Sequence, residues 1–148
     1  MRMNTKVRYG LRAMIEIGSK EQTSGILQKE ISEIQEIPLR YLDSIITDLR
    51  NAGLIVNFSG KRSGYILSKD PGEITVYDIF RAFEPELTLV NCACPGNECK
   101  RIEICPAKDY WFDLNSGIKN LMKSTTLNQL VKKNRTLLNI ASQDIELS

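Results

Sequence analysis

The chain has 148 residues, of which 42% are hydrophobic and 26% are charged, with a formal net charge of +2. These values are ordinary for a soluble protein that folds as one domain with an appendage. The sequence contains no histidine, which removes the usual general base of Ser-His and Cys-His catalysis. Because no nucleophile-base pair or nucleotide-binding glycine motif can be assembled either, we expect that the protein is not an enzyme.

Membrane association is not expected from the sequence. No apolar stretch approaches the roughly 20 residues that a membrane-spanning helix needs, and the N-terminal residues lack the apolar run of a signal peptide. We therefore predict a cytoplasmic protein with no membrane partner, in a compartment that keeps cysteines reduced.

Three helices are predicted in the first third of the chain. Apolar residues at intervals of three and four predict a helix from Thr5 to about Ser19 and a short second helix around Leu27–Ile34. Pro38 marks the start of a third helix and Gly53 marks its end. The predicted buried residues of the third helix are Leu42, Ile45, Ile46 and Leu49.

A β-hairpin is predicted after the third helix. The segments Leu54–Phe58 and Tyr65–Ser68 have the composition of strands, and they flank a turn with two glycines. Helix, short helix, helix and hairpin, in this order, are typical of a winged helix-turn-helix. We therefore predict a mainly α fold with a small β-hairpin wing, and a DNA-binding domain over residues 1–85. A capping-box sequence at Thr75–Asp78 would open the last helix of this domain, which would end before Pro85.

All the cysteines lie in one short, turn-rich segment with the spacing C-x-C-x4-C-x5-C. Thiolates are ligands of iron–sulfur clusters and of zinc, and thiolates on flexible backbone can converge on one ion or cluster. A thiol or disulfide redox switch, a zinc site and inert thiols are the alternatives. Residues 86–105 are therefore a candidate sensor loop, whose thiols are Cys92, Cys94, Cys99 and Cys105.

A long helix is predicted from Pro106, followed by a short helix up to residue 133. The apolar residues of the long helix repeat at intervals of three and four, and they form a stripe that is too narrow to pack against a globular core. We predict that the same helix of a second chain covers this stripe in a homodimer, and packing within one chain is the alternative. The conformation of residues 134–148 is left open. The predicted dimerisation residues are Trp111, Leu114, Ile118 and Leu121.

Several motifs resemble the bacterial family of iron–sulfur cluster regulators, which are winged helix-turn-helix transcription factors. They are Arg8–Met14, Tyr41–Leu42, Leu49–Leu54, Gly64–Leu67 and the cysteine segment. The resemblance extends from residue 1 to about 133. It implies a transcriptional regulator, such as a repressor, that is controlled by redox state, iron, cluster supply or nitric oxide. Its cofactor would be a 2Fe–2S or 4Fe–4S cluster that need not remain in the purified protein.

The resemblance implies three cysteine ligands, namely Cys99, Cys105 and one of Cys92 and Cys94. The chain departs from the family in the fourth ligand. Lys108 stands where some members have a histidine ligand, and Arg8 stands where others supply an aspartate from the first helix of the partner. If Cys92 and Cys94 both bind, the site is all-thiolate, which is an ordinary ligand set for either cluster. Further candidates for the fourth ligand are Glu98, Glu103 and Asp109.

A winged helix-turn-helix places its third helix in the major groove and its wing at the backbone or in the minor groove. Arg40 could bind guanine through two hydrogen bonds, and Asp43 could accept one from cytosine or be only a surface acid. Lys61 and Arg62 at the hairpin tip would contact phosphates, although such cations are often only solvated. A dimer should bind an inverted repeat in double-stranded DNA. The predicted DNA-binding residues are Arg40, Tyr41, Asp43, Ser44, Thr47, Lys61 and Arg62.

A different class of function also fits the predicted fold. The winged helix could dock on another protein, so that the chain acts as an adaptor. The salt dependence of DNA affinity separates the two hypotheses, because a DNA-binding protein releases counterions and loses affinity as salt rises.

Overall fold

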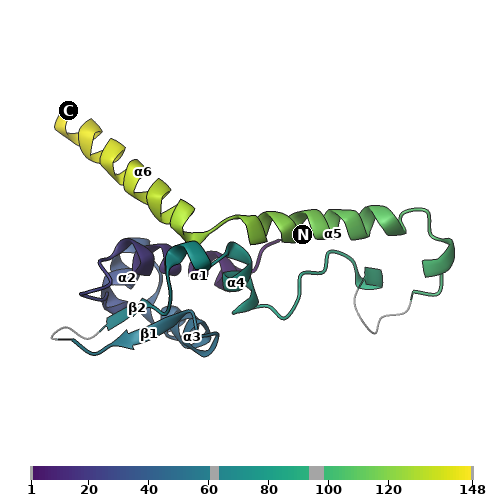
Figure 1. Ribbon diagram of the computed structural model, residues 1–148, viewed down its shortest axis with the longest axis horizontal. Helices are drawn as coiled ribbons and strands as arrows, with labels where there is room; N and C mark the ends of the chain where they lie inside the picture. Colours follow the sequence, from purple (N-terminus) through teal and green to yellow (C-terminus); the bar gives the residue numbers. More distant parts are fainter. Residues whose placement is uncertain (1, 61–63, 94–98, 148) are drawn as a thin grey trace.

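The computed structural model describes residues 2–60, 64–93 and 99–147. It confirms a mainly helical fold with one two-stranded antiparallel hairpin and a long C-terminal helix (Figure 1). The α-helices and strands are, in chain order, α1 (Thr5–Ser19), α2 (Gln28–Gln35), α3 (Leu39–Asn51), β1 (Ile55–Phe58), β2 (Gly64–Leu67), α4 (Val76–Arg81), α5 (Lys108–Ser124) and α6 (Leu127–Leu147).

The first helix and the turn between α2 and α3 are fixed by local hydrogen bonds. Asn4 caps α1, because its side-chain oxygen accepts a hydrogen bond from the Lys6 backbone N–H at 2.8 Å. At the end of α2, Glu36 adopts a φ of 52°, and the Ser32 hydroxyl donates to the Ile37 carbonyl at 2.6 Å. This bond and the left-handed conformation of Glu36 close a tight turn, so α3 starts directly after Pro38.

The main core lies between α1, α2, α3 and the hairpin, and α6 closes it on one side. The predicted buried face of α3 is confirmed, since all its residues are at most 2% exposed. The largest fully buried side chains are Met14, Ile17, Ile31, Ile37, Leu42, Ile45, Leu49, Ile55, Ile74, Ile79, Leu127 and Val131.

The hairpin is attached to the loop before α2 by backbone hydrogen bonds. Its register pairs Ile55 with Leu67 and Phe58 with Gly64. Ile26 and Tyr65 exchange two further bonds, with N···O distances of 3.0 and 2.8 Å. A Cβ atom on Gly64 would lie 2.6 Å from the Ile26 carbonyl oxygen, so this close approach requires glycine.

The helix α4 begins with the predicted capping box. The Thr75 hydroxyl accepts from the Asp78 N–H at 3.1 Å, and the Asp78 carboxylate accepts from the Thr75 N–H at 2.9 Å. Phe80 from this helix joins Val7 and Leu87 in a second, smaller core. This core is the place where α5 contacts the winged unit.

The helix α6 has a packed half and an exposed half. Leu127 and Val131 are buried against α1, where a Cβ atom on Gly18 would lie 2.9 Å from the Val131 side chain. Asn134 donates to the Ser19 hydroxyl at 3.1 Å. The helix then continues to Leu147 and is longer than the short helix that we expected. Residues 135–147 are all exposed, and Figure 1 shows this end of α6 pointing away from the rest of the chain.

Within the described part of the chain, none of the helices has the length and hydropathy that crossing a bilayer requires.

Candidate functional site

The outward face of α3 carries polar side chains opposite its buried apolar face. Arg40 and Thr47 are exposed and Ser44 is half-buried. The Thr47 hydroxyl donates to the Asp43 carbonyl at 2.9 Å, so its oxygen can still accept a hydrogen bond. These residues are predicted DNA-binding residues, and the helix presents them on one exposed surface.

The flank of α3 that faces α2 holds Asp43. Its carboxylate accepts a hydrogen bond from the side-chain amide of Gln28, the first residue of α2. Gln28 was absent from the predicted site. Its place on the polar side of the short helix could have suggested it, but only the crossing of α2 and α3 brings it to Asp43.

The opposite flank of α3 packs against α1. The ring of Tyr41 meets the ring of Tyr9 edge-on, with centroids 5.7 Å apart. Asp48 pairs with the Lys6 ammonium at 3.1 Å. Tyr41, a predicted DNA-binding residue, is therefore partly buried and contributes to the packing of the unit.

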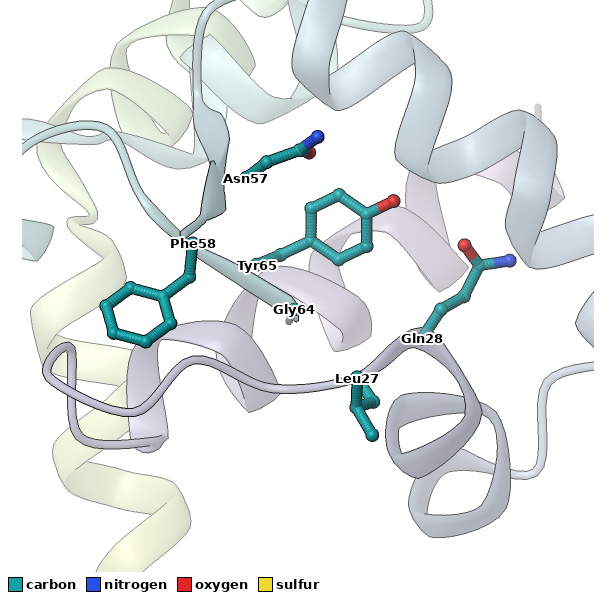
Figure 2. Close-up of a pocket in the computed structure, with 6 residues that line it drawn as sticks. All are labelled: Leu27, Gln28, Asn57, Phe58, Gly64 and Tyr65. Carbon is teal, nitrogen blue, oxygen red and sulfur yellow. The ribbon is translucent and has the colours of Figure 1, made fainter. Parts of the chain in front are cut away.

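A cavity of about 300 Å³ lies between the hairpin and the N-terminal end of α2. Figure 2 shows Asn57 and Tyr65 of the hairpin on one side of this cavity and Gln28 of α2 on the other. Because Gln28 also contacts Asp43, the cavity continues the polar surface from α3 to the wing. The predicted contacts Lys61 and Arg62 lie outside the described residues.

The cysteine segment extends away from the winged unit (Figure 1). Of the described cysteines, Cys92, Cys99 and Cys105 are half-buried free thiols, and Cys94 lies outside the described residues. The three thiols suit an iron–sulfur cluster by donor type. Across residues 2–60, 64–93 and 99–147, however, no three Cys, Asp or Glu side chains converge on one point.

Two of these cysteines flank a short 3₁₀ helix, Ile102–Ile104, that leads into α5. The Cys99 carbonyl accepts from the Ile102 N–H at 3.0 Å, and the Cys105 carbonyl accepts from the Lys108 N–H at 3.3 Å. Lys108 is the first residue of α5. The backbone of Cys105 is therefore bonded directly to the start of the long helix.

The predicted dimerisation stripe of α5 is divided by the fold. Ile118, together with Met122, packs on the second core beside Phe80. Trp111 is half-buried, whereas Leu114 and Leu121 are 39% and 68% exposed. One part of the stripe thus serves packing within the chain, and another part stays open.

An ion-pair cluster supports the contact between α4 and α5. Glu86 accepts from Lys119 and from Arg81, the latter at 3.1 Å, and Lys123 lies 4.9 Å from the centre of the Tyr77 ring. The hydrogen bond from Lys119 lowers the pKa of Glu86, and the same bond raises the pKa of Lys119. The charged forms of both groups therefore favour this contact.

Comparison with known proteins agrees with this architecture. Residues 3–133 match the Rrf2 family, described as iron-dependent transcriptional regulators. The chain is 31% identical to the HTH-type transcriptional regulator IscR of Vibrio campbellii, over 100% of this chain and 88% of that protein.

Solved structures give the same result. The chain is similar to CymR, the global cysteine regulator of B. subtilis, with a TM-score of 0.75 and 29% identity, over 90% of this chain and 98% of that one. It is also similar to T. potens IscR, with a TM-score of 0.73 and 28% identity, over 90% of this chain and 88% of that one. The polar face of α3, the attached hairpin and these matches lead to one conclusion: the chain belongs to the Rrf2 family of winged-helix transcriptional regulators.

Proposed function

We propose that the protein is a homodimeric regulator that binds an inverted-repeat operator and is controlled by an iron–sulfur cluster on its cysteine segment. The observation that carries this proposal is the hydrogen bond between the Cys105 carbonyl and the first residue of α5. The helix α5 in turn contacts α4 of the winged unit, whose helix α3 carries the exposed polar face. A ligand bound to the thiols would then act on the helix that positions the winged unit.

DNA binding is the part that family membership supports directly. Arg40, Ser44 and Thr47 would face base edges in the major groove, because they project from the exposed side of α3. Asp43 would be oriented by Gln28, which leaves fewer of its oxygen lone pairs for cytosine. The wing, including Lys61 and Arg62, would contact the backbone or the minor groove.

Cys92, Cys99 and Cys105 would hold the cluster, with Cys94 as the fourth thiolate. A bound cluster supplies a group that oxidation, nitrosylation or loss can change. The chain's own contribution is to connect the thiols to α5 through the 3₁₀ helix Ile102–Ile104, and to connect α5 to α4 through Ile118 and the Glu86–Lys119 pair.

A thiol switch without a cluster is the second candidate. It is favoured by the similarity to CymR, whose structure from Staphylococcus aureus in an oxidized form has a TM-score of 0.69 with 32% identity. The described thiols are free and half-buried, so oxidation could reach them. Zinc is also compatible with these ligands.

The test begins with protein purified without oxygen. Visible absorption and the iron and sulfide content are measured for the wild type and for single serine substitutions of Cys92, Cys94, Cys99 and Cys105. Loss of colour with Cys99→Ser and Cys105→Ser would support the cluster, and the other two variants would identify the remaining ligands. Lys100→Ala, at an exposed residue of the same segment that is not a candidate ligand, is the control and should keep the colour.

DNA binding is measured on the same samples. Operators are selected from random duplexes, and affinity is then followed as salt increases. A steep decrease in affinity with salt supports DNA binding. If the iron-free wild-type protein still binds an inverted repeat, the thiol switch is favoured. If the protein has no measurable affinity for duplex DNA, the adaptor is favoured.

A further inference from the structure

The exposed half of α6 continues the apolar face of its packed half. Positions along this face follow the alternating intervals of four and three that are typical of paired helices. They are Leu127, Val131, Asn134, Leu138, Ala141 and Ile145. The first three contact α1 or lie beside it, but Leu138 is 58% exposed and Ile145 is 75% exposed.

This exposed half lies largely outside the family match, which ends at residue 133. Residues 137–147 form about three helical turns, a length that is marginal in water without packing. Their apolar stripe therefore requires a partner surface to stabilise the helix.

Charged residues flank the stripe in an order that identifies the partner. At about 100° per residue, Lys133 and Asp144 fall on one flank, and Arg135 and Glu146 fall on the other. In an antiparallel pair of identical helices, each flank faces the same flank of the other chain. The basic residues of one helix then face the acidic residues of the other on both flanks. A parallel pair would instead place the basic residues of the two helices next to each other.

From this pattern we infer that the C-terminal halves of α6 from two copies of the chain pair antiparallel, centred near residue 140. Leu138 lies opposite the partner's Ala141 in this register. Lys133 faces the partner's Asp144 and Arg135 faces the partner's Glu146, each within about 3 Å along the helix axis. This inference rests on the homodimer of the proposed function and gives it a second contact besides α5.

A groove beside the stripe completes the fit. It has a volume of about 250 Å³ and lies between α1 and α6, where Ile15, Leu130 and Leu137 provide apolar walls and Lys133 lies at the edge. The antiparallel register places the partner's Ile145 opposite Asn134, which also lines this groove. The partner's Ile145, which has an acidic residue on each side in the sequence, therefore reaches an apolar groove that has Lys133 at its edge.

The test measures the dimer dissociation constant of the full chain by sedimentation equilibrium, under reducing conditions without oxygen. Two charge-reversal variants are used, K133E/R135E and D144K/E146K, together with the fourfold variant that combines them. Each double variant should weaken dimerisation about 10-fold, because like charges then face each other at four positions. The fourfold variant should return to within about threefold of the wild type.

Rescue by the fourfold variant separates a contact between copies from a loss of folding, and circular dichroism checks the helix content of each variant. A chain shortened after Thr136 should dimerise at least about 30-fold more weakly. A fourfold variant that is no tighter than the double variants would overturn the inference.

The outcome also distinguishes this inference from the proposed homodimer. If the shortened chain dimerises like the wild type while Leu121→Asp in α5 is monomeric, the α6 contact is wrong and the homodimer stands. If the wild type is monomeric at micromolar concentration, both are wrong.

Discussion

The winged unit and the arm formed by the cysteine segment and α5 are stabilised in different ways. The unit encloses a continuous core in which residues such as Met14 and Leu42 are fully buried. Among its described residues, the arm contributes the buried Leu87 and the partly buried Ile118 and Met122 to a small core that also contains Val7 and Phe80. A well-packed unit joined to a weakly packed arm is suited to regulation, because the arm can change position without unfolding the winged unit that binds DNA.

The same truncation in the two regions should have the most different results. Leu42→Ala removes a fully buried side chain and should lower the free energy of unfolding by about 2–5 kcal/mol. Ile104→Ala, in the arm and outside the predicted dimer stripe, removes a side chain that is 69% exposed and should change this free energy by about 0.5 kcal/mol or less. Urea unfolding followed by circular dichroism measures both at a concentration that fixes the oligomeric state. Equal losses would show that the arm is as well packed as the unit.

The attachment of the wing gives the next largest effect. Gly64→Ala places a Cβ atom 2.6 Å from the Ile26 carbonyl oxygen, so the backbones must separate. We expect a loss of about 1–3 kcal/mol in the free energy of unfolding, together with weaker DNA binding. Gly117→Ala in α5 is the matched control, because nothing lies within 4 Å of its Cβ position and the helix should become slightly more stable.

Removal of a base contact should change DNA recognition without changing stability. Arg40→Ala is expected to reduce affinity for the preferred operator by about 5- to 100-fold and to relax the sequence preference at one position. Lys29→Ala, an exposed cation of α2 outside the predicted contacts, serves as the control. Selection of the same operator sequence by both variants would show that Arg40 reads no base.

The contact between arm and unit should respond to pH, with the smallest effect of the series. Glu86 has a lowered pKa, so its stabilising charge is fully present above its usual value of 4.5 and is lost as the pH falls through the lowered pKa. Lys119 has a raised pKa, so its charge is present below its usual 10.5 and is lost as the pH rises through the raised pKa. Glu86→Gln should remove the acid part of this dependence. Hydrogen exchange of the α4 and α5 backbone amides at several pH values measures this dependence. If Glu86→Gln keeps the pH dependence of the wild type, the Glu86–Lys119 pair does not stabilise the contact.

The two regions also differ in how far the sequence predicts them. Apolar periodicity located α1 and the buried face of α3 because local spacing determines both, and the capping box at Thr75 was visible for the same reason. The bond from Gln28 to Asp43 depends on the crossing of two helices, which no local pattern contains. The stripe on α5 was recognised, but its spacing could not show that Ile118 turns toward Phe80.

The attachment of Cys105 to α5 has a mechanical consequence. From Lys108 to the contact at Ile118 the helix measures about 15 Å, so Ile118 can serve as the pivot of a lever. A tilt of about 10° around this pivot corresponds to about 3 Å of movement at the cysteine end. A small rotation of α5 about this contact would therefore be amplified into a larger displacement at the end that carries Cys105.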